Sequence, residues 1–214
     1  MTKYAMSRRR RNLIITICTL VLAGLFVIDR TAVRPAWRQR QAQTQSQQTS
    51  ADFEKYHAKK FTVVKVVDGD TLDINIPDAN YQHTRIRLWG IDTPETKDPR
   101  RGPMYFGKEA SDYATKLTLD KQVTIYLDEG RNTRDKYHRL LAYIQLPDGK
   151  FLNEELLSEG YAYADLRFKH SFYNKYKQLE AFARSHKLGL WANVTFDQLP
   201  EWLQRERPEL ANKK

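Results

Sequence analysis

Two short stretches of the chain concentrate acidic side chains at the ends of strand-like sequence. V-V-D-G-D-T-L contains Asp68 and Asp70, and R-I-R-L-W-G-I-D-T-P-E-T contains Asp92 and Glu95, three residues apart around a proline. Carboxylates held together repel one another unless a positive charge lies between them. Hard oxygen ligands without a nearby His or Cys favour Ca²⁺ or Mg²⁺ over Zn²⁺. The two stretches are therefore a candidate metal site.

Each acidic stretch also has a purely structural interpretation. Asp68-Gly69 between two strands is typical of a hairpin turn, whereas Asp70 opens the next strand. The tetrapeptide D-T-P-E at 92–95 can begin a helix, with one of its first two residues as the cap and its proline at the first helical position. The acidic residues taken singly leave both interpretations open.

Two arginines accompany the acids. Arg87 alternates with Ile86 and Leu88 and so points away from their face, and Arg139 closes D-K-Y-H-R just before a strand. Either arginine could be an ordinary structural residue, Arg87 in an ion pair and Arg139 at a strand start. Together with a metal and a carboxylate that activates water, however, planar guanidiniums are the groups that phosphodiester cleavage requires.

The surrounding sequence predicts five short strands with helical cover. Apolar and polar residues alternate in the strand segments 71–77, 85–90 and 122–128, and 61–67 is a β-branched run. The last helical segment repeats apolar residues every three to four positions. Asn153 is the predicted cap of a short helix that Gly160 ends. Such an order is compatible with a small closed barrel such as an OB-fold. Strands are expected at 61–67, 71–77, 85–90, 122–128 and 140–146, and helices at 105–117, 154–159 and 172–187.

From about Phe61 to Trp191 the sequence resembles the staphylococcal nuclease (thermonuclease-like) family. The matching stretches are V-V-D-G-D-T-L, R-L-W-G-I-D-T-P-E-T, F-G-K-E-A, D-K-Y-H-R-L-L-A-Y-I and L-N-E-E-L-L-S-E-G-Y-A. The resemblance implies an α+β fold, mainly a five-stranded OB-fold barrel with about three helices. It also implies a monomeric, calcium-dependent nuclease that cuts DNA and RNA, preferably single-stranded, with little sequence preference.

The resemblance implies a calcium site made from the acidic stretches. Asp70 and Asp92 would be carboxylate ligands of one Ca²⁺ ion, and Thr93 would contribute its backbone carbonyl. Asp68 would lie in the outer shell.

The same resemblance implies the catalytic groups. Glu95 corresponds to the presumed general base, and Arg87 and Arg139 correspond to the two arginines that bind the phosphate. The products would end in a 3′-phosphate, because water displaces the 5′ oxygen.

Several neighbouring residues are candidate substrate contacts. Tyr137 could touch the phosphate or a base, and His138 next to it is expected to be a surface side chain. Lys97, with Arg100 and Arg101, could draw a strand towards the site, although the same loop could be an ordinary solvated one.

The segment 161–172 departs from the family pattern. Leu166 stands where a tyrosine that helps to seat the nucleotide is expected. Tyr163 or Phe168 are the candidates to replace it. The departure concerns base stacking and leaves the catalytic residues intact.

The positive charge of the chain is concentrated at its amino terminus. The formal net charge is +10, yet residues 1–60 carry 12 Lys and Arg against 3 Asp and Glu, and the remaining 154 residues carry 24 against 23. The globular part is nearly neutral, so nucleic acid must be bound there by a local patch of basic side chains. The only cysteine, Cys18, excludes a disulfide framework and a cysteine metal site.

An uncharged apolar run, 13–28, follows the basic leader 1–12. At about 1.5 Å per residue it spans ~24 Å, slightly less than a hydrocarbon core of ~30 Å. We expect 13–29 to be an uncleaved single-pass anchor, since no clean small-x-small cleavage site follows; a cleaved signal and a secreted domain are the alternative. The leader predicts a cytoplasmic amino terminus and an extracytoplasmic domain, at the cell surface or in the periplasm, although four arginines between 30 and 40 weaken that prediction.

The rest of the chain is expected to form three segments. A segment rich in Gln, Ser and Thr predicts a flexible linker over 30–58, which leads into a nuclease domain over 59–195. A tail, 196–214, lies beyond the resemblance. Three of its residues could dock on the barrel as a short helix, namely Leu199, Trp202 and Leu203.

Two other classes of function compete with the nuclease. A catalytically inactive OB-fold could bind single-stranded nucleic acid or a protein partner without cutting it. A scaffold of that kind is expected to have lost some of the acids or arginines, and here all are present. A hydrolase acting on glycans is a weaker alternative, because Arg87 and Arg139 would then have no anion to bind.

Overall fold

A computed structural model describes residues 8–97 and 102–212, without the side chains of Ile14, Ala32 and Asn212. It divides into two compact units, 1–48 and 49–214, which are described separately.

The first unit is helical. It contains α1 (Arg8–Ile28), the π-helix η1 (Asp29–Val33) and most of α2 (Arg34–Tyr56). The most apolar 18-residue window of this helix has a mean hydropathy of 2.2 and none of it is buried, so by length and composition it could cross a membrane. A signal sequence near the amino terminus would have the same properties.

The structure differs from the expectation of a flexible linker over 30–58, because η1 and α2 occupy most of this range. The segment contains no glycine and is rich in Gln, Ala and Arg, which have high helix propensity. Pro35, a residue that usually disrupts a helix interior, lies just after the π-helical turn η1. Asp52 and Tyr56 are buried, so the folded domain includes residues before the expected start at 59.

An ion-pair network fixes the end of α2 to the barrel. Asp52 accepts hydrogen bonds from Arg134 Nη2 at 2.7 Å and from Thr133 Oγ1 at 2.6 Å. Arg134 also pairs with Asp78. The buried carboxylate of Asp52 thereby holds the loop that leads into the D-K-Y-H-R stretch.

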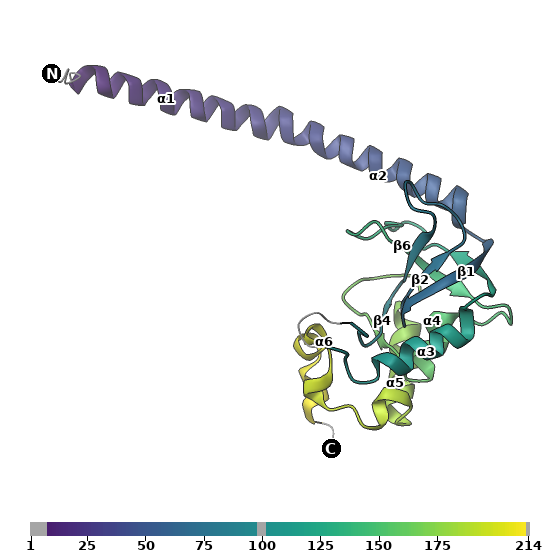
Figure 1. The fold of residues 1–214 in the computed structure, drawn as a ribbon. Helices are drawn as coiled ribbons and strands as arrows, with labels where there is room; N and C mark the ends of the chain where they lie inside the picture. Colours follow the sequence, from purple (N-terminus) through teal and green to yellow (C-terminus); the bar gives the residue numbers. More distant parts are fainter. Residues whose placement is uncertain (1–7, 98–101, 213–214) are drawn as a thin grey trace, which may run out of the picture. The chain divides into compact units, whose positions relative to one another are not determined.

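Five strands form a closed barrel in the order β1-β2-β3-β6-β5 (Figure 1). β3 and β6 are parallel, whereas the other neighbours, including the closing pair β1 and β5, are antiparallel. The expected five-stranded OB-fold barrel is therefore confirmed. The strands are β1 (Lys59–Asp68), β2 (Thr71–Ile74), β3 (Thr84–Leu88), β5 (Gln122–Tyr126) and β6 (Leu140–Gln145).

Three helices cover the barrel, α3 (Gly107–Thr118), α4 (Leu152–Ser158) and α5 (Tyr173–Ser185). The prediction that Asn153 caps α4 is wrong, because Phe151 is the cap residue. Asn153 is instead buried and bridges two barrel segments: its Oδ1 accepts from the Ile144 amide at 3.1 Å and its Nδ2 donates to the Trp89 carbonyl at 3.0 Å. Satisfying buried backbone groups outweighed the capping preference.

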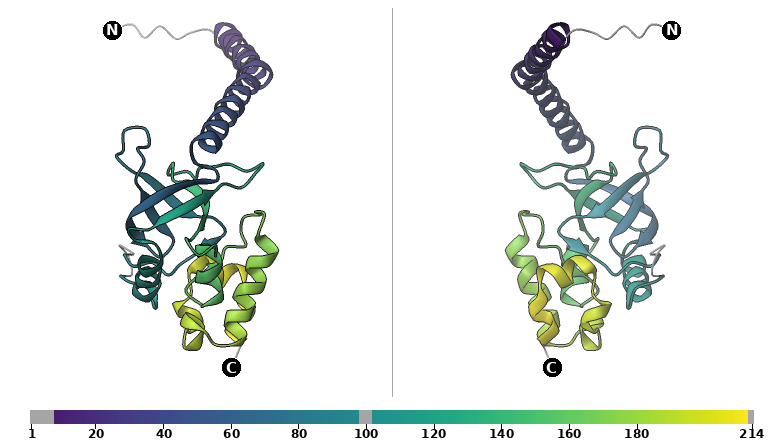
Figure 2. Two further views of the ribbon diagram at one scale, coloured as in Figure 1. Left: turned by 90° about the vertical axis from the view of Figure 1, so that its right-hand side faces the viewer. Right: turned by 90° about the vertical axis from the view of Figure 1, so that its left-hand side faces the viewer.

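Of two further features, the two short strands were not expected from sequence, whereas a short helix in the tail was. β4 (Ile91–Asp92) pairs with β7 (Tyr163–Ala164), and each has only two residues. The chain after α5 forms four short helices, and in both views of Figure 2 its yellow carboxyl-terminal part lies beside α5. They are η2 (Gly189–Ala192), η3 (Phe196–Gln198), α6 (Glu201–Glu206) and η4 (Pro208–Asn212).

Candidate active site

Pairing of β2 with β3 brings the first acidic stretch next to Arg87. Thr71 is the cross-strand partner of Arg87, and the Leu88 amide donates to the Asp70 carbonyl at 2.8 Å. Ile86 and Leu88 point into the core, and Arg87 points out between them. The alternation seen in sequence thus places the guanidinium at the β1–β2 turn.

Arg87 lies between the two carboxylates that were predicted from sequence to be metal ligands. Its Nη1 is 2.9 Å from Asp70 Oδ2, and its Nη2 is 2.5 Å from Asp92 Oδ1. Nη1 also donates to the Ile91 carbonyl at 2.8 Å. In this structure the positive charge between Asp70 and Asp92 is therefore the guanidinium of Arg87. The structural ion pair that the sequence left open for Arg87 is present.

Thr93 belongs to the same cluster. Its amide donates to Asp70 Oδ2 at 2.8 Å, and its side chain is almost completely buried. A Cβ on Gly69 would lie 2.8 Å from Thr93 Oγ1, so the turn must carry a glycine to let the two stretches approach. Asp68-Gly69 is a hairpin turn and part of the cluster at the same time.

Burial and mutual repulsion raise the pKa values of two of these acids. Burial and then the charge of Asp70 raise the pKa of Asp68 to about 7. Burial raises the pKa of Asp92 to about 6, although the charge of Arg87 opposes the change. The charge of Arg87 therefore offsets the effect of burial on Asp92 only in part.

Glu95 follows β4 in an irregular segment, and the helix start considered for residues 92–95 is not formed. The Met104 amide donates to the Glu95 carbonyl at 2.9 Å, and a Cβ on Gly107 would lie 2.7 Å from the same oxygen. The backbone of Glu95 is thus fixed against the start of α3. Its side chain is exposed, and its charge contributes to the raised pKa of Asp68.

Arg139 directly precedes β6, the strand beside β3, and pairs with an acid outside the cluster, Asp135. Leu141, two residues later on β6, is the partner of Arg87. The Arg139 Nε and Nη2 atoms are each 2.7 Å from Asp135 Oδ2, and the exposed ring of Tyr137 lies 5.4 Å from the guanidinium carbon. The structure therefore places Arg139 and Tyr137 in the loop that leads into β6, the strand next to Arg87.

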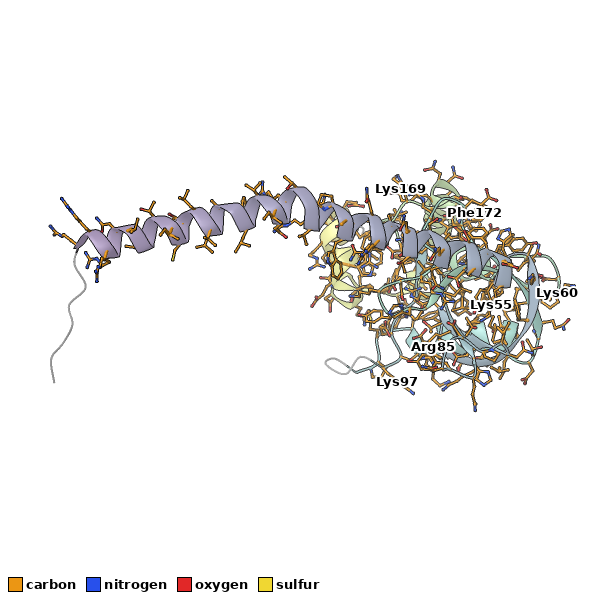
Figure 3. The ribbon with its side chains drawn as sticks, turned by 90° about the horizontal axis from the view of Figure 1, so that it is seen from above. Lys55, Lys60, Arg85, Lys97, Lys169 and Phe172 are labelled. Atoms are coloured by element: carbon orange, nitrogen blue, oxygen red, sulfur yellow. The ribbon has the colours of Figure 1, made fainter. Side chains whose placement is uncertain are left out.

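Of the other substrate candidates, Lys97 is an exposed side chain (Figure 3), and Arg100 and Arg101 lie outside the described residues. His138 is exposed, as expected, with a φ of 63°. Tyr163 is completely buried, so it cannot stack on a nucleotide. Phe168 is 52% exposed and remains available in place of the missing tyrosine at 166.

A buried histidine supports the turn between β3 and β4. The His170 ring is so close to Gly90, whose φ is 78°, that a Cβ there would lie 2.5 Å from Nε2. Its Nδ1 is 3.1 Å from the Tyr143 hydroxyl oxygen. Burial lowers the pKa of His170 to about 4, so the folded protein keeps the ring neutral.

We expect this histidine to make the fold acid-sensitive. The unfolded chain takes up the proton near pH 6.5, so the free energy of unfolding falls as the pH drops from about 6.5 to about 4, by up to about 3 kcal/mol. His170→Gln removes this contribution. Denaturant unfolding across that pH range should show the stability advantage of the unaltered protein shrinking with acid, and parallel curves would contradict the prediction. Asp68 and Asp92 titrate in both proteins, so their contributions to the pH dependence cancel when the two free energies of unfolding are subtracted.

The oxygen donors present fit a calcium-type ion. Within residues 8–97 and 102–212 no group of three His, Cys, Asp or Glu side chains is arranged to hold a metal. Two carboxylates and a backbone carbonyl, from Asp70, Asp92 and Thr93, would therefore need water to complete the shell, and calcium accepts such mixed oxygen ligands.

One residue of the site was not nominated as such from sequence. The Trp202 indole nitrogen donates to Asp92 Oδ2 at 2.7 Å, across 110 residues of chain. The tail was expected to dock, but its position gave no indication of a contact with an acid of the site.

The fold and the site define an OB-fold barrel that carries an acid–arginine cluster at the end of its β2–β3 pair. The family model "Staphylococcal nuclease homologue" matches residues 85–193. The chain belongs to this family, and the expected resemblance is confirmed.

Individual relatives agree with the family match. The thermonuclease of Staphylococcus hyicus is 32% identical over 145 residues, which cover 67% of this chain and 82% of that protein. The thermonuclease of Staphylococcus intermedius is 36% identical over 140 residues, covering 62% and 76%. Endonuclease YncB of Bacillus subtilis (strain 168) is 33% identical over 133 residues, covering 61% of each chain.

Proposed function

We propose that this protein is a membrane-anchored, calcium-dependent nuclease that hydrolyses DNA and RNA, preferably single-stranded, with low sequence specificity. The observation that carries the proposal is the Arg87 guanidinium held between Asp70 and Asp92, with the charge of Glu95 beside Asp68. The names of the relatives, thermonuclease and endonuclease, support the same reaction class.

Asp70, Asp92 and the Thr93 carbonyl would hold one calcium ion, with Asp68 in the outer shell. When bound, calcium would neutralise a phosphate oxygen and so favour attack on phosphorus. The short contacts among Asp70, Arg87 and Thr93 keep these groups in one place without it.

In the hydrolytic step, Glu95 removes a proton from a water molecule as the water oxygen attacks phosphorus. The bond from phosphorus to the 5′ oxygen breaks, and that oxygen leaves with a proton from solvent, so the upstream product ends in a 3′-phosphate. Arg87 and Arg139 bind the charge that develops on the phosphate oxygens. Tyr137 and Lys97 are the proposed substrate contacts.

The experiment uses the full chain in detergent, with labelled single-stranded DNA and RNA, in calcium and then in chelator. Calcium-dependent cleavage to products that accept no further 3′ extension until a phosphatase is added would support the proposal. Binding without calcium-dependent cleavage would favour the alternative, an inactive OB-fold module for single-stranded nucleic acid or a protein partner.

For location, we propose a single-pass anchor at 13–29 with a cytoplasmic amino terminus and an extracytoplasmic nuclease domain. The exposed apolar helix α1 is long and apolar enough for an anchor, and a signal sequence would have the same properties. Digestion of the domain by protease added to intact cells would support this topology. A domain released into the medium would instead indicate a cleaved signal.

A further inference from the structure

The carboxyl-terminal tail packs on the barrel end that carries the site. Leu199 and Leu203 are buried with Tyr163 and Leu190 in a second hydrophobic cluster, apart from the barrel core. Tyr163 is the β-bridge partner of Asp92. The tail therefore packs against β7, the strand that pairs with the one holding Asp92.

A buried ion pair fastens the tail to α5. Arg207 Nη1 is 2.5 Å from Glu180 Oε2, and the side chain of Glu180 is completely buried. Breaking a buried pair of this kind is strongly unfavourable. The tail is thus held at a defined position by apolar and ionic contacts together.

Trp202 uses this position to contact Asp92. Its indole N–H donates to Asp92 Oδ2 at 2.7 Å, while Arg87 Nη2 holds the other oxygen, Oδ1, at 2.5 Å. With a donor on each oxygen, the carboxylate has one defined rotation. Each oxygen keeps a second lone pair, because an ionised carboxylate has about four acceptor positions.

The indole ring is itself clamped. The guanidinium carbon of Arg167 lies 4.1 Å from the centre of the Trp202 ring. Arg167 is held by two hydrogen bonds of 2.8 Å to Asp165, whose amide donates to the Gly90 carbonyl. This series of contacts, from Asp165 through Arg167 to Trp202, therefore fixes the direction of the indole N–H.

We propose that Trp202 is a positioning residue that orients the Asp92 carboxylate for a divalent cation, so that the tail is an integral part of the active site. The inference rests on the proposed function. It assigns a role to a residue beyond the matched family region, 85–193. An indole N–H carries no full charge, so it can orient Asp92 without replacing the cation.

The test is the calcium affinity of the full chain in detergent, measured by titration calorimetry in the absence of nucleic acid. Trp202→Phe removes the N–H and keeps an aromatic ring. Loss of an outer-shell partner typically weakens metal affinity about 10–100-fold, and that loss is expected here. The matched control is Trp191→Phe: Trp191 packs in the same cluster, and within the described residues its N–H has no hydrogen-bond partner. Its calcium affinity should be unchanged.

Equal calcium affinity for Trp202→Phe and the unaltered protein would overturn the inference and leave the proposed function standing, provided that both cleave. Tighter binding by the variant would also overturn it, since Trp202 would then compete with the ion. An unaltered protein that neither binds calcium nor cleaves would overturn the proposed function and this inference together.

A second pair of variants covers the case in which phenylalanine at 202 prevents folding. Trp202→Gln keeps a side-chain N–H donor, and Trp202→Met has a similar length and none. At least tenfold tighter calcium binding by the glutamine variant would support the inference, and equal binding by the two would overturn it.

Discussion

Replacing Arg87 with lysine is expected to reduce kcat on single-stranded DNA by about two orders of magnitude or more. The two terminal nitrogens of Arg87 lie on different partners, Nη1 on Asp70 and Nη2 on Asp92. One ammonium nitrogen cannot span both carboxylates, nor can it bind two phosphate oxygens at once. A well-placed donor to the developing charge contributes roughly 3–4 kcal/mol, which corresponds to the expected loss.

Arg85→Lys is the matched control for this prediction. Arg85 lies two residues earlier on β3 and forms a two-point ion pair with Asp73, but its side chain is 49% exposed. Because the hydrogen bonds of Arg85 go to Asp73 and not to a proposed catalytic group, kcat should be nearly unchanged. If Arg87→Lys retained more than a tenth of the kcat, the assignment of Arg87 to the transition state would be wrong.

Three barrel strands, β2, β3 and β5, were predictable because apolar and polar residues alternate along them. β3 shows the reason: Ile86 and Leu88 are buried in the core, and Arg85, on the opposite face, is exposed. The same alternation predicted that Arg87 leaves the core. The alternation could not predict that β3 pairs with β2, and this pairing brings Arg87 to Asp70.

The elements that the sequence did not predict are those whose stability comes from distant parts of the chain. β4 and β7 have two residues each, too few to show a period, and they form because Asp92 and Tyr163 pair across 71 positions. Trp202 likewise reaches Asp92 through the packing of Leu199 and Leu203. Local sequence carries no information on such contacts.

The linker prediction shows a different limit. Segment 30–58 was interpreted from its Gln, Ser and Thr content as flexible, yet its lack of glycine and its many good helix formers favour α2. The buried pair of Asp52 with Arg134 then extends the folded domain into this helix. Composition described its polarity correctly but gave no information on its backbone.

Glu95→Gln is expected to lower kcat by about 10²–10⁴, the usual contribution of a general base. Glutamine has the same shape but cannot accept the proton from water at neutral pH. The backbone contact from Met104 to the Glu95 carbonyl does not involve the changed group, so the fold should be retained. Calcium affinity, measured by calorimetry, should stay within a few-fold, because Glu95 is not among the proposed ligands.

Glu109→Gln is the control for the lost charge, since Glu109 is an exposed residue in the first turn of α3. Its kcat should be nearly unchanged. If Glu95→Gln were equally active, the base would have to be another carboxylate of the cluster, and Asp68 is the one whose pKa, raised to about 7, suits that task. Asp68→Asn would then abolish the acidic limb of the pH–rate profile. If Glu95 is the base, the acidic limb of the pH–rate profile is lost in Glu95→Gln and persists in Asp68→Asn.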